Sequence, residues 1–288
     1  LFHKLWEKGV NGKMFRVLYN LYQGANRVVS HDGCVTDAFS SDLGLHEGDV
    51  ISPTLYLFFI DGLLKEVHAK HPGVTLLSPM GIEESVVAAM QADDFVAVCD
   101  SAEQARAVAN TVYAYSCKWR FRLNSSKSAL MHVAAAQSQE LSESGIVWNG
   151  VSVPVVDKYR YLGLWFENGC SWKYHCEQTL YRAEQVKKRL MPLWKNRHVC
   201  VDVKRIVLLT LIRPIVEYGS EVWWPSRSRQ IELLDKLQTD IVKCAMRCDH
   251  ENPSSLAVLA EWGLKPMHMW LEERAIEYFF KVLRMPNH

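Results

Sequence analysis

The stretch VVAAMQADDFVAVCD, from Val86 to Asp100, places two adjacent aspartates between two short apolar runs. The runs Val86–Met90 and Phe95–Cys99 have the length of strands and contain β-branched residues, so they predict two strands joined by a tight turn. Asp93 and Asp94 then lie in that turn, at the edge of a core. Two carboxylates on a rigid hairpin suit a divalent cation, although a solvated surface turn has the same sequence signature.

The composition is that of an ordinary globular chain, because 49% of the 288 residues are hydrophobic and 23% are charged. Apolar runs such as Leu55–Ile60 are too short to span a bilayer, so no membrane partner is expected. The eight cysteines are irregularly spaced, which favours free thiols over a disulfide framework. Cys244, Cys248 and His250 could begin a zinc site, but no fourth ligand follows at finger-like spacing.

The net charge of +1 conceals two blocks of opposite sign. Between Asp32 and Glu103 the chain has 13 acidic and 2 basic residues. Between Tyr181 and Arg213 it has 9 basic and 2 acidic residues. Such blocks fit a cation site beside a polyanion site, and they fit two solvated faces equally well.

Turn signals predict two further hairpins, and residue pattern predicts two further strand segments. A hairpin is expected over Arg27–Leu43 with its turn at His31–Gly33, and Asn149-Gly150 is a strong two-residue hairpin signal. The segments Ala129–Val133 and Lys158–Glu167 are also interpreted as strands.

Cap signals predict the helices. Ser52 is expected to cap a buried helix that has Pro53 at its first position. Ser101, followed by Gln104, forms a capping-box pattern for a helix that runs to about Trp119. After about Ser171 the pattern is mainly helical, and Pro214 is expected to end or kink one of these helices. The sequence therefore predicts an α+β part followed by an all-α part.

Five segments, in this order, resemble the motifs of reverse transcriptases from non-LTR (LINE-like) retrotransposons. They are GLHEGDVISPTLYLFFIDGLL, QADDF, KWRFRLNSSKSALM, YRYLGLWF and RPIVEYGSEVWW. This resemblance implies a partial right-hand polymerase palm over residues 1–171, including a primer-grip hairpin, and a helical thumb with a C-terminal extension over residues 172–288.

The resemblance also assigns roles to individual residues. Asp93 and Asp94 would bind the two catalytic Mg²⁺ ions, and Lys127 would approach the triphosphate, where an ammonium neutralises charge and carries a transferable proton. The nucleotide and template pocket would contain Gly48, Ser52 and Pro53. The primer backbone would meet Tyr161, Leu162 and Gly163. Duplex phosphates would meet a set of basic residues: Lys187, Lys188, Arg189, Lys195, Arg197, Lys204 and Arg205.

The chain departs from the family pattern in three ways. Glu47 stands where the family usually has Gln, and Gln91 stands where it usually has an aromatic residue. The first palm motif, which carries a further metal-binding aspartate, is not found in these 288 residues. Two Mg²⁺ ions would then lack a bridging carboxylate, and the hairpin Val86–Cys99 would have an unpaired edge.

The expected function is therefore that of a fragment of an RNA-directed DNA polymerase that is inactive alone. Its partners would be an RNA template, a DNA primer and a deoxynucleoside triphosphate, inside the cell in the nucleus or cytoplasm; the sequence does not indicate an oligomeric state. Three alternatives stay open: a non-catalytic remnant that binds nucleic acid, a decayed retroelement copy, and an unrelated Mg²⁺ phosphotransferase.

Overall fold

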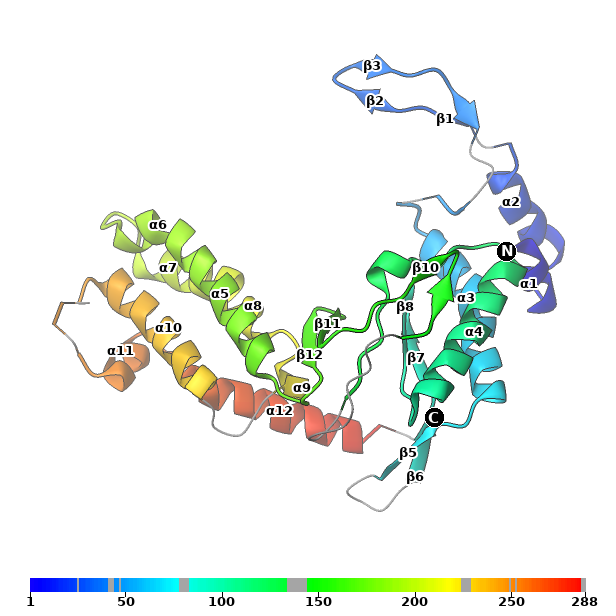
Figure 1. The fold of residues 1–288 in the computed structure, drawn as a ribbon. Coiled ribbons are helices and arrows are strands. Elements are labelled where there is room, and N and C mark those ends of the chain that lie inside the picture. The colour runs from blue at the N-terminus through cyan, green and yellow to red at the C-terminus, as the bar shows by residue number, and fades with distance from the viewer. Residues whose placement is uncertain are drawn as a thin grey trace. The chain divides into compact units, whose positions relative to one another are not determined.

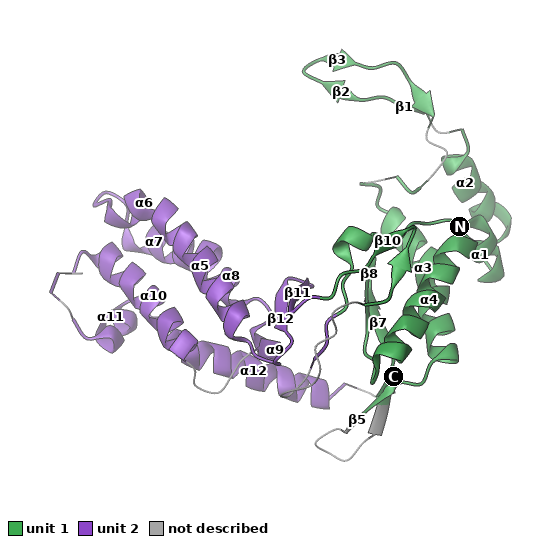
Figure 2. Cartoon of the chain, viewed as in Figure 1, with its two compact units in different colours: residues 1–130, 142–155 green, residues 131–141, 156–288 purple. Residues whose placement is uncertain are grey.

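A computed structural model of the chain describes residues 1–24, 26–40, 44–46, 48–77, 83–133, 144–223, 229–248, 250–251 and 253–285. The chain divides into two compact units (Figure 2). Unit 1 comprises residues 1–130 and 142–155, and unit 2 comprises residues 131–141 and 156–288. The fold is a mixture of helices and small antiparallel sheets, which is compatible with the predicted α+β class. No described helix has the length and apolarity needed to cross a membrane.

Unit 1 consists of four helices, a 3₁₀ turn and five two-strand ladders or hairpins (Figure 1) among its described residues. Its helices are α1 (Phe2–Glu7), α2 (Gly12–Tyr22), α3 (Ser52–Lys70) and α4 (Ala102–Trp119), and the 3₁₀ turn is η1 (Ser125–Lys127). Its strands are β1 (Asn26–Arg27), β2 (Ser30–His31), β3 (Cys34–Val35), β4 (Phe39–Ser40), β5 (Val74–Leu77), β6 (Glu83–Val86), β7 (Ala88–Gln91), β8 (Asp94–Ala97), β9 (Val147–Trp148) and β10 (Val151–Ser152).

The core of unit 1 lies where α3 and α4 pack with strand β7. Buried apolar side chains from all three meet there, namely Ile60, Leu63, Val67, Val87, Ala88, Val108, Val112 and Tyr115. The ring of His68 on α3 also hydrogen-bonds the carbonyl of Ala88, at 3.0 Å. Helix α3 therefore supports the strand that leads into the aspartate pair.

Local sequence signals set several boundaries in unit 1 as predicted. Helix α4 starts after Ser101, whose Oγ accepts the Gln104 N–H at 3.1 Å, and it ends at Trp119. The two-residue hairpin at Asn149-Gly150 is confirmed, with φ of +51° and +78°. The hairpin after Arg27 is confirmed in its described residues, and Leu43 lies outside them.

Two predictions for unit 1 are wrong. Ser52 is the first residue of α3 and not its N-cap, which is Ile51. Its hydroxyl donates to the His46 carbonyl, at 2.6 Å, instead of accepting a helix N–H. The expected strand Ala129–Val133 forms only a single bridge, between Leu130 and Val155. Among the described residues, no ladder of two or more residue pairs forms at this segment.

Unit 2 is mainly helical and begins with one hairpin. The hairpin joins β11 (Lys158–Tyr161) and β12 (Leu164–Glu167). The helices are α5 (Lys173–Arg189), α6 (Met191–Lys195), α7 (Val201–Val207), α8 (Arg213–Glu217), α9 (Ser220–Trp223), α10 (Arg229–Met246), α11 (Ser255–Glu261) and α12 (Met267–Leu283). The predicted domains 1–171 and 172–288 stay a prediction.

The chain does not break at Pro214. Helix α7 continues directly into a π-helical segment, Leu208–Ile212, and then into α8, where Pro214 occupies the first turn. A proline ring clashes with the carbonyl four residues before it in an α-helix. The wider π turn lies at that point, so the expected interruption takes the form of a change in helix type.

The core of unit 2 is built around tryptophan and aliphatic side chains. Trp194, Trp223, Leu234, Ile241 and Leu271 are each fully enclosed. They come from four helices, so α6, α9, α10 and α12 share one core. Leu164 of the hairpin joins this core, which fixes β12 to the helices.

Candidate active-site turn and nucleic-acid interface

The aspartate pair lies at a two-residue turn between β7 and β8. Gln91 pairs with Asp94 as the last rung of the ladder, so Ala92 and Asp93 form the turn. Both aspartates are exposed, and Gln91 is exposed beside them. The predicted strand, tight turn and strand are confirmed, and the two carboxylates are presented to solvent from a hairpin that rests on the unit 1 core.

The backbone of this turn is strained. Ala92 has a φ of +54°, a left-handed conformation that costs a residue with a Cβ about 1–2 kcal/mol. At the turns Asp32-Gly33 and Asn149-Gly150 the positive-φ residues are types that favour it. Strained non-glycine turns cluster at functional sites, and Ala92 directly precedes the aspartate pair.

Helix α3 places Tyr56 near the aspartate pair. Burial raises the pKa of the Tyr56 hydroxyl, and the negative charge of Asp93 raises it further. The phenol therefore stays protonated at neutral pH and can donate a hydrogen bond. Tyr56 was not predicted as a site residue, and its place four residues after Ser52 in the family-like motif is the signal in the sequence that indicates it.

The loop before α3 is organised by Ser52. Its N–H donates to the Asp49 carbonyl at 3.2 Å, and the Tyr22 hydroxyl lies 3.3 Å from its Oγ. Gly48 has a φ of +82° with open space where a Cβ would lie, so it provides the left-handed conformation that this loop needs. Glu47 lies outside the described residues. Pro53 is in the first turn of α3, as predicted.

The Asn-x-x-Lys segment has a clear local geometry. The side-chain oxygen of Asn124 accepts the N–H of Lys127, at 3.2 Å, and the hydroxyl of Ser126, at 2.7 Å. This caps the 3₁₀ turn Ser125–Lys127. The exposed Lys127 is thereby held at a defined point of unit 1.

The carboxylates of unit 1 do not form a complete cation site in the described part of the chain. No group of three or more Asp, Glu, His or Cys side chains converges among the described residues. Asp93 and Asp94 are oxygen donors of the type that divalent ions prefer. Two ions between them need more carboxylate ligands than this pair supplies.

In unit 2 the β11–β12 hairpin presents a second strained turn. Leu162 and Gly163 form a two-residue turn with φ of +46° and +84°, and Leu162 is 40% exposed. The hydroxyl of Tyr218 donates to the Leu162 carbonyl at 2.7 Å. The motif around Tyr218 was recognised in the sequence, but this residue was not assigned a role.

Most of the predicted basic residues are exposed on unit 2. Lys187 is half-buried and pairs with Asp240 at 3.5 Å. The exposed ones come from α5, α6, the loop after α6 and α7: Lys188, Arg189, Lys195, Arg197 and Arg205. These five exposed residues, which we call the basic helices, carry positive charge of the sign that attracts a polyanion.

Lys204 does not belong to this surface, so the prediction that it meets duplex phosphates is corrected. It is 3% exposed, and its Nζ donates to the carbonyls of Trp194 at 2.8 Å and Ala245 at 3.1 Å. Burial lowers the pKa of this ammonium. Lys204 therefore joins α6, α7 and α10 inside unit 2.

Comparison with known proteins identifies the family. The family model for reverse transcriptase (RNA-dependent DNA polymerase) matches residues 1–166, which include the aspartate turn and most of the β11–β12 hairpin. The chain belongs to the reverse transcriptase family. A similar curated protein is the RNA-directed DNA polymerase from the mobile element jockey of Drosophila funebris. It is 19% identical over 258 residues, which is 84% of this chain and 27% of the relative.

Two points follow from this comparison. The jockey element is LINE-like and non-LTR, so the resemblance drawn from the motifs is confirmed. The chain spans about a quarter of the length of that relative, 27%. The activity, substrates and partners of this member of the reverse transcriptase family are therefore proposed and are not shown by the comparison.

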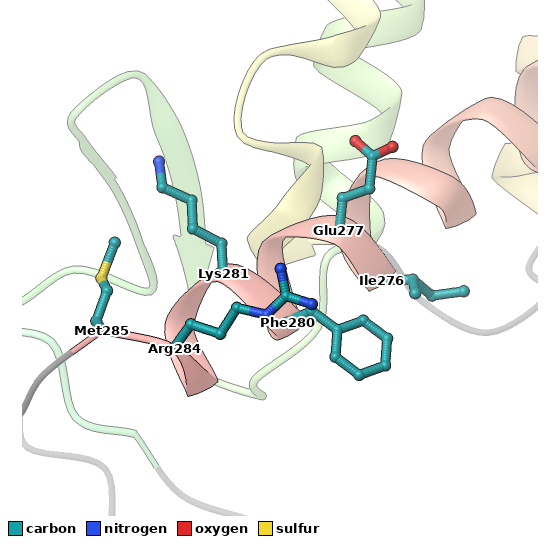
Figure 3. A pocket seen from close by; sticks show the side chains of 6 residues that line it. All are labelled: Ile276, Glu277, Phe280, Lys281, Arg284 and Met285. Carbon is teal, nitrogen blue, oxygen red and sulfur yellow. The ribbon is translucent and has the colours of Figure 1, made fainter.

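A shallow pocket of about 600 Å³ lies elsewhere, on the last helix of unit 2 (Figure 3). All its lining residues come from the end of α12 and the residues just after it: Ile276, Glu277, Phe280, Lys281, Arg284 and Met285. No predicted site residue lines this pocket.

Proposed function

We propose that this chain is the palm and thumb portion of an RNA-directed DNA polymerase from a non-LTR retrotransposon. The parent reaction adds a deoxynucleotide to the 3′-hydroxyl of a DNA primer on an RNA template. The observation that carries the proposal is the exposed Asp93-Asp94 pair on a strained hairpin turn within the matched family region. Unit 1 is the palm in this proposal, and the helices after residue 171 are the thumb.

Asp93 and Asp94 are the proposed ligands for divalent ions, two Mg²⁺ in the complete enzyme. The first palm motif, which carries a further metal-binding aspartate in the family, is not found in the sequence, and we propose that this carboxylate comes from outside these 288 residues. The 288-residue chain is then inactive alone. Lys127, held by its Asn124 cap, is the proposed partner of the nucleotide triphosphate.

The nucleic-acid contacts are proposed for two parts of unit 2. The Leu162-Gly163 turn meets the primer backbone, and Tyr161 lies next to it in β11. The basic helices meet phosphates of the RNA–DNA duplex, which is near A-form and is therefore bound by its backbone and shape. Binding by such contacts weakens steeply as salt rises, because the phosphates release condensed counterions.

Primer extension with Mg²⁺ on an RNA template tests the proposal. The proteins compared are this chain, a longer polypeptide that includes the upstream segment of its gene, and both with Asp93→Asn. Asp100→Asn is the matched control, because Asp100 is an exposed carboxylate of unit 1 just after the hairpin. Extension by the longer polypeptide that is lost in Asp93→Asn and kept in Asp100→Asn supports the proposal. Extension by the 288-residue chain alone contradicts the proposed incomplete site.

A second candidate function is a non-catalytic protein that binds nucleic acid. It is favoured by the basic helices, since their five exposed charges belong to unit 2 and are independent of the aspartate turn. In this case the longer polypeptide also fails to extend the primer. Salt-sensitive binding of the hybrid then persists in Asp93→Asn.

A further inference from the structure

Tyr218 contacts the β11–β12 turn, although 56 residues of sequence separate it from Leu162. The Tyr218 hydroxyl donates to the Leu162 carbonyl at 2.7 Å. The phenol ring also lies directly against Gly163, where an added Cβ would come within 2.8 Å of Tyr218 Cε1. Tyr218 therefore contacts both residues of the turn, one through its hydroxyl and the other through its ring.

The backbone next to Tyr218 also packs closely against the hairpin. Gly219 has a φ of +66°, and a Cβ there would lie 2.7 Å from Cδ2 of Leu164. The indole N–H of Trp223 donates to the Tyr218 carbonyl at 2.9 Å, and Trp223 is fully buried. Tyr218 is thus anchored to the unit 2 core through its main chain, while its side chain holds the hairpin.

The turn needs such support. Leucine rarely adopts a positive φ, so Leu162 at +46° is a poor residue for the first position of this turn. A hydrogen bond to its carbonyl stabilises the observed conformation. Within the described part of the chain, the amides of Leu162 and Gly163 have no hydrogen bond, so both are available to a phosphate oxygen.

We propose that Tyr218 is a positioning residue for the primer, an inference that rests on the function proposed above. Its hydroxyl fixes the Leu162-Gly163 turn so that the two amides meet the phosphates next to the primer 3′ end. The turn is open to such a ligand, because Leu162 is 40% and Tyr218 57% exposed. Tyr218 acts through the turn and does not touch the reacting atoms.

The test is a hydroxyl-radical footprint of an RNA–DNA hybrid with a recessed DNA primer, bound to the 288-residue chain. In Tyr218→Phe the ring stays against Gly163 and only the hydroxyl is lost. We expect protection at the last few primer nucleotides to fall about 2- to 10-fold, the range of one hydrogen bond. Affinity for a fully paired hybrid stays the same within about twofold, because the basic helices are unchanged. Tyr181→Phe is the control, since Tyr181 is an exposed tyrosine on α5 of the same unit.

A rescue variant separates positioning from general stability. Leu162→Asn creates an Asn-Gly pair, which favours positive φ at both turn positions on its own. In the double variant Tyr218→Phe/Leu162→Asn we expect primer-end protection to return, whereas a general loss of stability would not be corrected by this change.

The possible failures are distinguishable. If the unsubstituted chain protects the primer end and Tyr218→Phe protects it equally, the positioning role is wrong and the proposed function stands. If Tyr218→Phe loses protection and the double variant does not regain it, the positioning role is also wrong. If the unsubstituted chain leaves no footprint on the hybrid, the proposed nucleic-acid contacts of unit 2 are wrong and this inference with them, whereas the proposed polymerase function is decided by primer extension with the longer polypeptide.

Discussion

The imidazole Nδ1 of His175 accepts the backbone N–H of Trp165, at 3.2 Å, and so joins helix α5 to strand β12. His175 is 4% exposed, and its ring lies near the indoles of Trp172 and Trp223. Burial lowers its pKa to about 4, and the positive charges of Arg182 and Arg160 add to this effect. A neutral imidazole is required, because a protonated Nδ1 cannot accept the Trp165 N–H.

His175 predicts a pH dependence of stability. Its pKa in the native state lies below the ordinary value of 6.5. Between about pH 6.5 and 4 the unfolded state therefore takes up a proton that the native state does not. The stabilisation is fully present above pH 6.5 and is lost as the pH falls through this window. His175→Asn keeps an oxygen acceptor but cannot be protonated, so urea unfolding should show a smaller loss of stability from pH 7 to 4.5. An unchanged loss would contradict the prediction.

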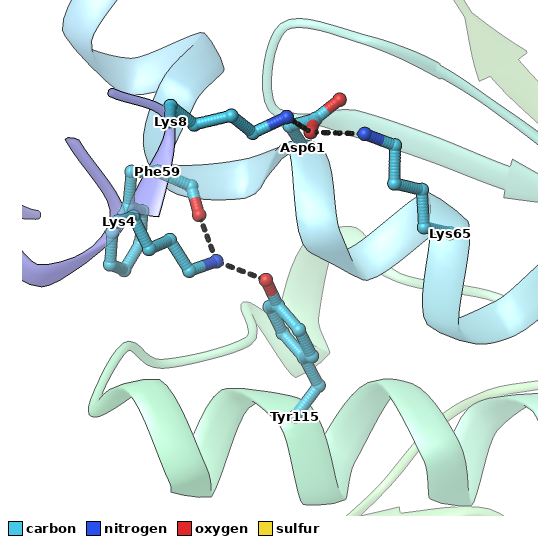
Figure 4. A network of polar contacts seen from close by, with 6 residues as sticks. All are labelled: Lys4, Lys8, Phe59, Asp61, Lys65 and Tyr115. Carbon is cyan, nitrogen blue, oxygen red and sulfur yellow. Dashed lines mark hydrogen bonds and ion pairs between the residues drawn. The ribbon is translucent and has the colours of Figure 1, made fainter. Parts of the chain in front are cut away.

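Two lysines of unit 1, Lys4 and Lys118, are predicted to contribute differently to its stability. The buried ammonium of Lys4 donates to the Phe59 carbonyl and the Tyr115 hydroxyl (Figure 4). The same ammonium lies 4.1 Å from the Trp119 ring centroid. Lys4→Ala leaves both acceptors without this donor, so we expect a loss of about 1–3 kcal/mol in the free energy of unfolding. Lys118→Ala is the control, since Lys118 is an exposed lysine beside the same indole. Equal effects of the two substitutions would refute the structural role of Lys4.

Lys188 and Lys204 are predicted to differ, although both were assigned to duplex phosphates from the sequence. Lys188 is exposed, so Lys188→Ala should weaken hybrid binding and reduce the slope of log affinity against log salt by about one unit or less. Lys204→Met should leave that slope unchanged and lower the melting temperature, because the buried ammonium bonds two carbonyls. Binding titrations at several salt concentrations, with melting curves, test both. A reduced slope in Lys204→Met would show that this ammonium reaches the phosphates.

The charged cluster around Arg274 predicts a further stability effect. Arg274 on α12 pairs with Glu221 and lies 3.7 Å from Glu217, which itself pairs with Arg213 at 2.5 Å. Arg274→Ala removes a partner from both carboxylates, and we expect a loss of about 1–3 kcal/mol for these partly buried groups. Arg284→Ala, an exposed position near the end of α12, should change the stability by less than about 0.5 kcal/mol. Denaturant unfolding of both variants makes the comparison, and a similar loss in Arg284→Ala would count against the cluster.

The parts of the fold that depend on neighbouring residues could be predicted from the sequence. The Asn149-Gly150 hairpin and the start of α4 after Ser101 were of this kind, because a turn or cap is decided within a few residues. The aspartate turn was found for the same reason. The role of Ser52 as cap was wrong, because its hydroxyl bonds the preceding loop at His46.

The parts that depend on distant residues could not be predicted. A basic residue in a helix is usually solvated, so nothing near Lys204 in the sequence shows that its ammonium bonds carbonyls of two other helices. The contact of Tyr218 with Leu162 likewise joins two motifs that were recognised separately. Their order in the chain identified the family, but their interlocking required the fold.

The π-helical segment Leu208–Ile212 accommodates one extra residue without changing the direction in which the following helix faces. A π turn holds about one residue more than an α turn, whereas each residue added to a regular α-helix turns the chain after it by about 100°. Deleting one residue from Leu208–Ile212 would therefore restore a regular α-helix and leave α8 facing as it does now. Tyr218, which follows α8 directly, would keep its contact with Leu162. The same deletion between Arg213 and Glu217 would turn Tyr218 away from Leu162, so a lost residue should be tolerated in the π-helical segment and not in α8.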